Sequence, residues 1–559
     1  MKLSLVKLSL VKLSLVKLSL TKAKLSHKQF KEFKEFITMP LSTSTDRQTV
    51  ISFGAGRLTI EDINAIARQQ ATVSLSGDQH FAEKIDAGVN FLDQLLKEDG
   101  TIYGVTTGYG DSCTVEIPLS LVHELPLHLT RFHGCGLGDM FNESQSRAIL
   151  ATRLCSLAQG FSGVSWDLLK QIVTFINRDI LPVIPQEGSV GASGDLTPLS
   201  YVAATLLGER DVFYRGIRQP VKGVMDQLNI KPITLRPKEG LAIMNGTAVM
   251  TALACQTFDR ADYLTKLCTR ITAMNSLALK GNSNHFDDIL FSVKPHEGQA
   301  QVAERIRNDL NHHEHPRNSK RLQDRYSIRC APHVIGVLAD TLPWLRQMIE
   351  NELNSANDNP IIDGIGEHVL HGGHFYGGHI ALAMDTMKNA VANLADLLDR
   401  QMALLMDVKF NHGLPSNLSA AEPDRAALNH GFKAVQIGCS AWTAEALKLT
   451  MPASVFSRST ECHNQDKVSM GTIAARDCVR ILDLTEQVTA ATLLAAYQGL
   501  RLRIKQGEVC EATLTPSMAD MLHDIDTFFP LVTEDRPLEG ELRQTMAYIN
   551  DQRWSLYDD

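Results

Sequence analysis

Aromatic residues, paired cysteines and long apolar runs are all scarce in this sequence of 559 residues. Only 6% of the residues are aromatic, while Leu and Ala are plentiful, which favours helix over sheet. The 10 cysteines stand singly, without a CxxC pair, so the sequence indicates neither a disulfide framework nor a zinc site. No uninterrupted apolar run reaches about 18 residues, and we therefore expect no transmembrane helix.

An excess of positive charge is also missing. The formal net charge is −8 at pH 7, which argues against nucleic acid as a partner. With 44% hydrophobic and 21% charged residues, the composition is typical of a folded, soluble protein. We expect a cytoplasmic location, no membrane partner and no bound metal.

The N-terminus differs in composition from the rest of the chain. Residues 2–21 read KLSLV three times and then KLSLT, and residues 1–35 hold nine Lys and two Glu. The leucines match neither helix nor strand periodicity for long, and the stretch lacks the apolar core and cleavage site of a secretory signal. We interpret residues 1–49 as a basic repeat extension that is disordered and has no part in the chemistry. A basic segment that lies on a membrane surface is the alternative.

The body of the chain is predicted to be mainly α-helical. Helical spacing of apolar residues follows Thr59, which is a plausible N-terminal cap. Residues 379–407 and 441–451 are rich in Ala and Leu, and the first of these segments would form a helix of roughly 43 Å. Helices of that length usually lie in a bundle. We therefore predict a smaller N-terminal domain over residues 50–255, then a long-helix bundle with a C-terminal helical region over residues 256–559.

Glycine-rich or polar stretches interrupt these helical patterns and are predicted to be loops. They are residues 100–113, 238–250, 351–363 and 459–471. In a helical bundle, loops of this kind usually carry the functional residues.

One further stretch, residues 188–203, reads GSVGASGDLTPLSYVA. Its glycines permit backbone angles closed to other residues. Asp195 is a plausible cap for a helix that begins at Leu196, with Pro198 in its first turn. An Ala-Ser-Gly tripeptide arises by chance in about one chain in five of this size, so its meaning depends on the rest of the sequence.

Several stretches together resemble the histidine and aromatic amino acid ammonia-lyases, in the family's order and spacing over residues 50–530. They are YGVTTGYG (103–110), residues 188–203, MNGT (244–247), QDRYSIRC (323–330), NSANDNP (354–360), GGHFYG (372–377) and HNQDKVSMG (463–471). Within this family, the sequence resembles a bacterial subgroup of tyrosine/phenylalanine ammonia-lyase-like proteins.

The resemblance implies that Ala192, Ser193 and Gly194 cyclise autocatalytically into the prosthetic group 4-methylidene-imidazol-5-one. None of the ordinary side chains is a good electrophile, yet the removal of an unactivated amino group needs an electron sink. The Gly194 nitrogen would attack the Ala192 carbonyl carbon, and water loss that includes the Ser193 hydroxyl would leave a methylidene. Strain in the turn would assist this step. No external cofactor is implied.

Other site residues follow from the resemblance position by position. Tyr103 is implied as the catalytic base for the β-proton, and a phenol must have its pKa lowered from near 10 for that role. Arg329 corresponds to the residue whose guanidinium forks onto the substrate carboxylate. Further positions that contact the prosthetic group or the substrate correspond to Asn245, Gln323, Tyr326 and Phe375, of which Tyr326 counts among the catalytic residues. His374 and Tyr376 depart from the family's usual GGNFH or GGNFQ pattern.

Two places in the family sort substrates, and in this sequence they disagree. The first place is the pair Phe132 and His133. At these two positions histidine lyases carry Ser-His, phenylalanine lyases carry Phe-Leu and many tyrosine lyases carry His-Leu. His133 can bond a phenol or an imidazole. Gln465 replaces the glutamate that histidine lyases usually carry, which forfeits a charge-assisted hydrogen bond worth about 1.5–3 kcal/mol. Lys467 is unusual for the family and has no explanation from the sequence.

The resemblance implies a homotetrameric ammonia-lyase whose active sites draw on three subunits, and we predict a small-molecule amino acid as substrate. Tyrosine is favoured over phenylalanine, with coumarate or cinnamate as product. A histidine ammonia-lyase that forms urocanate and a 2,3-aminomutase with the same prosthetic group are the alternatives. The fumarase and aspartase class has a different glycine signature, and a catalytically inactive scaffold would not be expected to retain Tyr103, Ser193 and Arg329 together.

Overall fold

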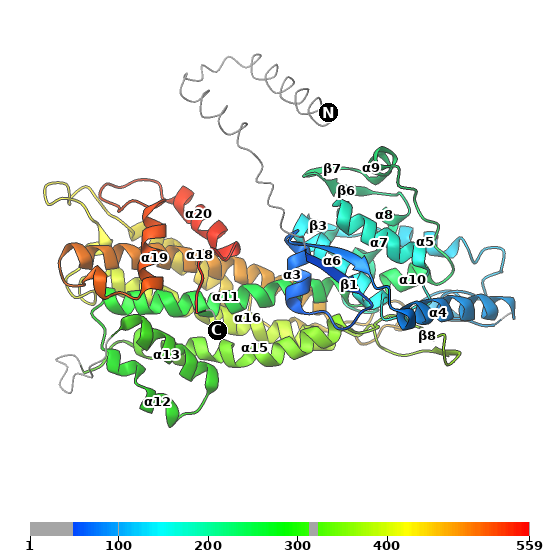
Figure 1. Cartoon of the computed structure of the whole chain (residues 1–559), viewed down its shortest axis with the longest axis horizontal. Coiled ribbons are helices and arrows are strands. Elements are labelled where there is room, and N and C mark those ends of the chain that lie inside the picture. Colours follow the sequence, from blue (N-terminus) through cyan, green and yellow to red (C-terminus); the bar gives the residue numbers. More distant parts are fainter. Residues whose placement is uncertain (1–48, 99, 312–321, 558–559) are drawn as a thin grey trace, which may run out of the picture. The chain divides into compact units, whose positions relative to one another are not determined.

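Long helices packed side by side hold most of the core (Figure 1). The computed structural model describes residues 49–98, 100–311 and 322–557. The extension predicted over residues 1–49 lies outside the described residues except for Thr49, which begins strand β1. The described chain is mainly helical, as predicted. Its helices are α3 (Ile60–Ala67), α4 (Gln79–Lys97), α5 (Leu125–Phe132), α6 (Glu143–Leu157), α7 (Trp166–Arg178), α8 (Leu196–Leu206), α9 (Val221–Leu228), α10 (Glu239–Met244), α11 (Ala248–Ala278), α12 (Asp288–Ser292), α13 (Glu297–Leu310), α14 (Tyr326–Arg329), α15 (Ala331–Leu353), α16 (Gly378–Met406), α17 (Lys433–Lys448), α18 (Gly471–Lys505), α19 (Pro516–Asp526) and α20 (Glu539–Asn550).

Helix α18, of 35 residues, lies at the centre of this bundle and packs against α11, α16 and α17. Its sequence is rich in Ala, Leu and Thr, and most of its side chains are buried. Small side chains allow neighbouring helices to approach closely on every side, which explains why a helix without a clear polar face is stable here. Helix α16 (29 residues) matches the helix predicted over residues 379–407 to within one residue at each end.

The described strands form small sheets at the N-terminal part of the chain and beside the bundle. Strands β1 and β2 are parallel, whereas β3–β5, β4–β6–β7 and β8–β9 pair antiparallel. Their bounds are β1 (Thr49–Phe53), β2 (Ala71–Leu75), β3 (Leu137–Met140), β4 (Leu181–Pro182), β5 (Pro185–Glu187), β6 (Asp211–Tyr214), β7 (Ile217–Pro220), β8 (Ile361–Asp363) and β9 (His368–Leu370).

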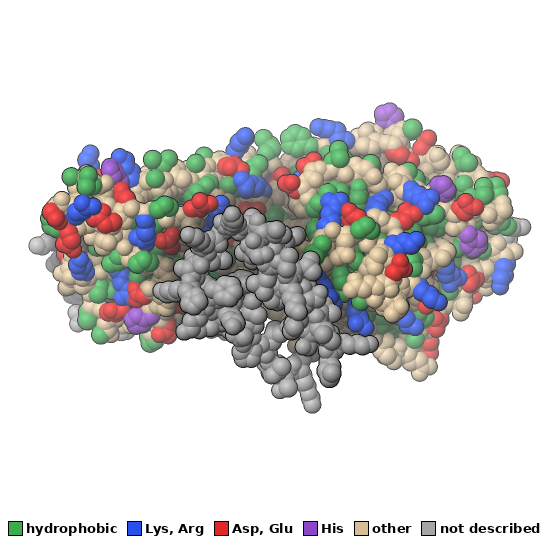
Figure 2. Space-filling model, turned by 90° about the horizontal axis from the view of Figure 1, so that it is seen from above, with side chains coloured by type: hydrophobic (Ala, Val, Ile, Leu, Met, Phe, Trp, Pro, Cys, Tyr) green, Lys and Arg blue, Asp and Glu red, His purple; other side chains and the backbone are tan. Residues whose placement is uncertain are grey.

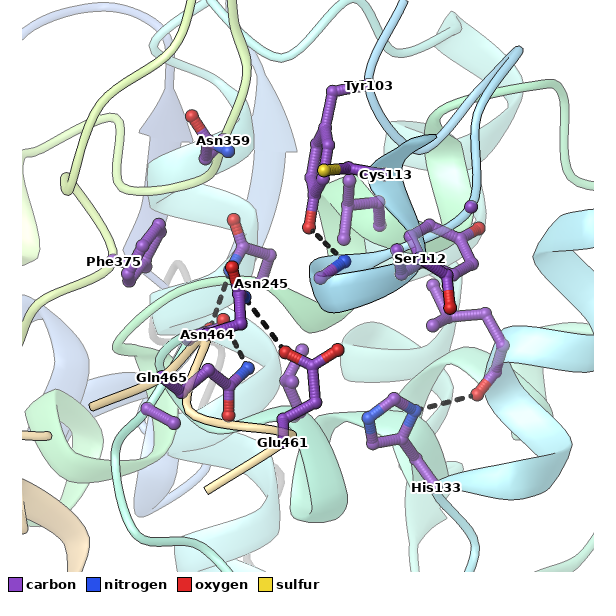
Figure 3. Close-up of a pocket in the computed structure, with 18 of the residues that line it drawn as sticks. Tyr103, Ser112, Cys113, His133, Asn245, Asn359, Phe375, Glu461, Asn464 and Gln465 are labelled. Atoms are coloured by element: carbon purple, nitrogen blue, oxygen red, sulfur yellow. Dashed lines mark hydrogen bonds between the residues drawn. The ribbon is translucent and has the colours of Figure 1, made fainter. Parts of the chain in front are cut away.

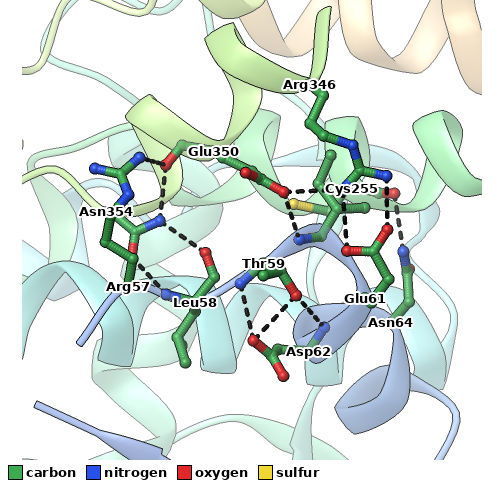
Figure 4. A network of polar contacts seen from close by, with 11 residues as sticks. Arg57, Leu58, Thr59, Glu61, Asp62, Asn64, Cys255, Arg346, Glu350 and Asn354 are labelled. Carbon is green, nitrogen blue, oxygen red and sulfur yellow. Dashed lines mark hydrogen bonds and ion pairs between the residues drawn. The ribbon is translucent and has the colours of Figure 1, made fainter. Parts of the chain in front are cut away.

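A polar network joins the first helix to the bundle (Figure 4). Thr59 caps α3 through a capping box with Asp62, so the predicted cap is confirmed. Arg346 of α15 forms a two-pronged ion pair with Glu61, at 2.7 and 3.0 Å. The Asn354 side chain accepts a hydrogen bond from the amide of Leu58 and donates one to its carbonyl, each at 2.8 Å. The N-terminal segment is thereby fixed against the end of α15.

One loop prediction is wrong. Residues 238–250 contain helix α10 and the start of α11, and only residues 245–247 lie between the two helices. Glycines at 240 and 246 suggested a continuous loop, but Gly240 lies inside α10, where an added Cβ would be 2.9 Å from Pro126. Tight packing, and not loop conformation, explains that glycine.

The division into domains at residue 255 stays a prediction, and this residue lies inside α11. No helix among the described residues has the length and apolarity needed to span a bilayer. On the face in Figure 2, basic and acidic side chains are interspersed over the described part of the surface. The cytoplasmic location stays a prediction.

Candidate active site

A cavity of about 960 Å³ opens beside residues 192–194, which we call the Ala-Ser-Gly turn (Figure 3). Its walls come from the loop after α4, the end of α5, the start of α8, the link between α10 and α11, and the loops that precede α16 and α18. Predicted site residues from distant parts of the chain meet here. Those that line the cavity are Tyr103, Phe132, His133, Ala192, Ser193, Asn245, Phe375 and Gln465.

The Ala-Ser-Gly turn lies directly against a second stretch of backbone. Gly194 has a φ of +76°, pairs with Gly246 in an isolated parallel bridge, and is followed by an amide, that of Asp195, which donates to the Gly246 carbonyl at 2.8 Å. An added Cβ at Gly194 would lie 2.1 Å from that carbonyl oxygen. Both the backbone angle and the close approach therefore require glycine.

Asp195 precedes α8 as predicted, but its side chain does not cap that helix. The carboxylate instead accepts hydrogen bonds from the amides of Val249 and Met250 at the start of α11, each at 3.0 Å. It also accepts from the hydroxyls of Ser189 and Thr472, the latter at the start of α18. Asp195 thus connects the turn to α11 and α18, whose contacting residues lie far from Asp195 in the sequence.

The electrostatics at Asp195 follow from these contacts. Burial raises the pKa of the Asp195 carboxyl, and the four donors oppose this effect. The N-terminal ends of α8, α11 and α18 meet at this residue, and helix N-termini carry partial positive charge. The positive ends of these helices are therefore directed at the Asp195 carboxylate, next to the Ala-Ser-Gly turn.

Two amide side chains hold Ser193. Asn245 donates through Nδ2 to the Ser193 carbonyl at 2.7 Å, and Gln465 donates through Nε2 to the Ser193 hydroxyl at 3.1 Å. The Thr460 hydroxyl donates to Oε1 of Gln465 at 3.0 Å and so fixes the orientation of that amide. Oδ1 of Asn245 is buried without a partner among the described residues.

These residues fit the prosthetic group that the sequence implies. Gly194 has no side chain beside its nitrogen, Ser193 lines the cavity, and the Ser193 carbonyl already has a donor in Asn245. The unpartnered Oδ1 of Asn245 offers one more acceptor beside the turn. A buried acceptor without a donor is unusual in a folded protein and often marks a functional site.

Tyr103 lies in the loop between α4 and the 3₁₀ helix Gly110–Thr114 and points into the cavity (Figure 3). Its hydroxyl oxygen accepts a hydrogen bond from the Gly110 amide at 2.7 Å. Burial raises the pKa of the Tyr103 hydroxyl above its usual value, and the nearby Glu461 carboxylate raises it further. This direction is opposite to the one that the sequence reasoning requires for a base, so the described residues alone do not prepare Tyr103 for its predicted role.

Phe132 and His133 lie together at the end of α5, with ring centroids 4.2 Å apart. Burial lowers the pKa of the His133 ring, which keeps it neutral at pH 7. Nδ1 lies 3.1 Å from the Leu129 carbonyl and carries the proton donated to it. The second ring nitrogen, turned away from that carbonyl in Figure 3, is then a hydrogen-bond acceptor.

Sequence reasoning missed Glu461, whose carboxylate lines the cavity between Tyr103 and His133 (Figure 3). It accepts hydrogen bonds from the Asp111 amide at 2.8 Å and from Nδ2 of Asn464 at 2.9 Å. An added Cβ at Gly110 would lie 1.8 Å from this carboxylate, so that glycine makes room for it. The signal was an acidic residue at the start of the polar loop over residues 459–471.

The sequence leaves two roles open for Glu445 of α17, placement of the substrate amine or a solvated helical glutamate, and its side chain does not line the cavity. Its side chain forms an ion pair with Arg480 at 2.6 Å, and both side chains are 47% exposed. Glu445 is therefore a surface glutamate of α17.

Three predicted site residues lie outside the cavity in a group of their own, which we call the α14 group: Gln323, Tyr326 and Arg329. Arg329 donates through Nη2 to Oε1 of Gln323 at 3.3 Å, and its guanidinium lies 4.6 Å from the centre of the Tyr326 ring. Tyr326 is 72% exposed. Within one chain, therefore, the predicted carboxylate clamp and the predicted base lie apart.

The charge of the cavity agrees with that separation. Lys467 is the only Lys or Arg among the described residues that line it, while Glu461 and Asp466 also line it. A substrate carboxylate would find little positive charge in this chain alone. Lys467, unexplained from the sequence, is now placed at the cavity wall.

Comparisons with known proteins identify the same family as the sequence motifs. A family model described as aromatic amino acid lyase matches residues 58–524. A histidine ammonia-lyase of Bacillus velezensis is 36% identical over 505 residues, which covers 90% of this chain and 96% of that protein. A tyrosine aminomutase structure from Streptomyces globisporus has a TM-score of 0.82 at 32% identity, with 90% of this chain and 98% of that chain covered. A histidine ammonia-lyase structure from Trypanosoma cruzi has a TM-score of 0.82 at 29% identity, with 90% and 94% covered.

Proposed function

The chain belongs to the aromatic amino acid lyase family, and from this premise we propose that it eliminates ammonia from an aromatic L-amino acid, tyrosine before phenylalanine. The product is a trans-arylacrylate, coumarate or cinnamate. The observation that carries the proposal is the arrangement of one cavity: Ser193 and Tyr103 line it together with a neutral histidine that offers a hydrogen-bond acceptor.

Each reacting part of the substrate has a counterpart in the cavity. The prosthetic group from Ala192, Ser193 and Gly194 supplies an electrophilic methylidene carbon. Tyr103 takes the β-proton on its hydroxyl oxygen, and the Gly110 amide stabilises the phenolate form of that oxygen. Asn245 holds the Ser193 carbonyl in place. The Glu461 carboxylate has acceptor capacity beyond its two present donors and receives the substrate ammonium.

The preference for tyrosine rests on His133 and Phe132. An apolar ring surface from Phe132 suits an aromatic substrate, and the second nitrogen of His133 accepts a hydrogen bond from a phenol. A site that bonds a substrate hydroxyl discriminates strongly against the analogue that lacks it, because its own polar group is left unpaired.

A histidine substrate is the second candidate, favoured by one observation and by the relatives. Glu461 places a carboxylate on the same side of the cavity as His133, so that an imidazole would find an acceptor and a negative charge. The relative from Bacillus velezensis bears the name histidine ammonia-lyase. Against this reading, Gln465 is neutral and is already engaged with Ser193 and Thr460.

A 2,3-aminomutase reaction is the third candidate, since a tyrosine aminomutase shares this fold over 90% of the chain. The same residues would serve, and only the return of ammonia to the β-carbon would differ. The product distinguishes the two reactions, because an aminomutase yields a β-amino acid and no net ammonia.

The α14 group supports a shared active site. Arg329, Tyr326 and Gln323 form a cluster outside the cavity, in which Tyr326 is 72% exposed, and no guanidinium of the described residues lines the cavity to bind the substrate carboxylate. We infer a homotetramer in which the α14 group of one subunit completes the cavity of another. The added guanidinium would also lower the pKa of Tyr103, which burial raises in the single chain.

An ultraviolet time course with purified protein tests the proposal. L-tyrosine, L-phenylalanine and L-histidine are compared in parallel, with an ammonia assay and chromatography of the products. A coumarate band with matching ammonia, faster than the cinnamate band, is expected. Urocanate as the main product would replace the substrate assignment, and a β-amino acid without ammonia would replace the reaction.

A further inference from the structure

Two closely packed layers lie behind the Ala-Ser-Gly turn. Gly194 lies against Gly246, and Gly246 in turn lies against the side chains of Arg153 and Asn357. An added Cβ at Gly246 would be 2.1 Å from Nη1 of Arg153 and 2.4 Å from Oδ1 of Asn357. Gly246 cannot move away from the turn without displacing this second layer of polar side chains.

Arg153 is a buried cation that makes no direct ion pair among the described residues. It lies on α6 with 0% of its surface exposed, and no ion pair joins it to an Asp or Glu of the described chain. Its guanidinium donates to the Asn245 carbonyl at 3.3 Å, to Oδ1 of Asn357 at 3.1 Å and to the Ser156 hydroxyl at 3.2 Å. Burial lowers its pKa to about 10, and the nearby carboxylates of Asp358 and Asp195 oppose this effect. A buried charge of this kind costs folding free energy, so a function other than stability is expected of it.

The contacts of Arg153 extend to both sides of Gly246. On one side it holds the carbonyl of Asn245, whose side chain donates to the Ser193 carbonyl. On the other side, Nδ2 of Asn357 donates to the Thr247 hydroxyl at 2.8 Å, and that hydroxyl donates to Oε1 of Glu352 at 2.6 Å. Residues 245–247 are thus fixed by side chains from α6, α15 and the loop that follows α15.

We propose that Arg153 is a positioning residue for the cyclisation of Ala192, Ser193 and Gly194, through Asn245 and Gly246. It keeps the backbone of residues 245–247 close behind Gly194, so that the turn cannot relax and the Gly194 nitrogen stays near the Ala192 carbonyl carbon. This inference rests on the proposed function, since it concerns the formation of that enzyme's prosthetic group.

The step balances without any oxidant or further reactant. A bond forms between the Gly194 nitrogen and the Ala192 carbonyl carbon. The Ala192 oxygen leaves as water with the hydrogens of the Gly194 and Ser193 nitrogens, and the Ser193 hydroxyl leaves as a second water with the Ser193 α-hydrogen. Arg153 takes no part in these bond changes and acts only through the backbone of residues 245–247.

The test is the intact mass of the full chain, which reports the loss of two waters independently of activity. In Arg153→Met we expect cyclisation about a hundredfold slower, the effect of a misplacement of about 1 Å between reacting atoms. Arg153→Lys, which keeps the charge but not the fork, should be intermediate. Arg147→Met is the matched control: this residue lies on the same helix, is 5% exposed and pairs with Asp179. It should lose stability but cyclise completely.

Each outcome decides between the proposals. Folded Arg153 variants with an unmodified Ser193, judged by a wild-type helical circular dichroism spectrum, support the inference. If Arg153→Met does not fold, Arg153→Lys decides by the same criterion. Complete cyclisation of both folded variants overturns the role of Arg153 and leaves the lyase intact. A wild-type chain that has lost two waters but releases no ammonia from any amino acid overturns the lyase and leaves the role of Arg153 intact. A wild-type chain with no loss of water overturns both.

Discussion

The Ala-Ser-Gly turn and the α14 group belong to the same predicted active site, yet their surroundings are opposite. Buried contacts within the chain tie Asp195, next to the turn, to α11 and α18, and tie Asn245, behind the turn, to α6. In the α14 group Gln323 and Tyr326 are exposed and Arg329 is half-buried, and the internal contacts are a hydrogen bond at 3.3 Å and a ring contact between neighbouring side chains.

This contrast indicates a division of tasks. A reactive group made from the chain's own backbone needs a strained turn that cannot relax. Close packing in a rigid, buried environment provides this. Recognition of a carboxylate needs a guanidinium that reaches the substrate, and a neighbouring subunit can bring it. The cavity would therefore determine the chemistry and the ring preference, while the α14 group would determine the affinity for a feature that all amino acids share.

Tyr103→Phe should have the largest effect and tests whether the chemistry belongs to the cavity. Loss of the general base is expected to lower kcat by about 10²–10⁴-fold. The intact mass should still show the loss of two waters, because Tyr103 does not hold the turn. A variant that cyclises incompletely would show instead that Tyr103 contributes to formation of the prosthetic group.

Arg329→Ala tests whether the α14 group acts across subunits. Removal of a charge-assisted carboxylate contact worth about 1.5–3 kcal/mol should raise KM for tyrosine, phenylalanine and histidine alike, by about 10- to 150-fold. Co-expression of Arg329→Ala with Tyr103→Phe should restore part of the activity, since a mixed tetramer contains sites with both residues intact. No recovery in verified mixed tetramers would contradict the shared site.

Local features of this fold could be predicted from the sequence because their causes are local. The capping box at Thr59 and the helix Gly378–Met406 depend on residues a few positions apart. The family motifs also named the residues that line the cavity, although no periodicity predicts that Tyr103 and Gln465 would meet.

Other features depend on contacts that sequence patterns do not encode. Asp195 looked like a helix cap because Leu196 follows it, but its partners at Val249 and Thr472 lie on other helices. Glu461 was overlooked because its entry into the cavity depends on the missing side chain of Gly110. Gly240 suggested a loop because close packing and loop conformation both favour glycine, and the sequence does not distinguish the two.

His133→Phe tests whether ring preference lies in the cavity alone. It should lower kcat/KM for tyrosine by about tenfold, since a phenol would lose its acceptor and be buried unpaired. The value for phenylalanine should stay level or rise, and the affinity for the carboxylate should not change. Parallel kinetics with the two substrates provide the measurement. An equal loss for both substrates would instead assign His133 a structural role in α5.

The smallest expected effect is a shift in pH dependence, and it joins the two regions. Because burial raises the pKa of Tyr103, its hydroxyl is protonated at neutral pH in the single chain, and the phenolate fraction grows as pH rises. Activity should therefore increase with pH up to the pKa of Tyr103 in the assembled site. If the partner's guanidinium lowers that pKa, Arg329→Gln should shift the rising limb of the pH profile of kcat/KM to higher pH, by about one pH unit. An unchanged limb would mean that the α14 group does not lie beside Tyr103, and that the base is prepared by other residues.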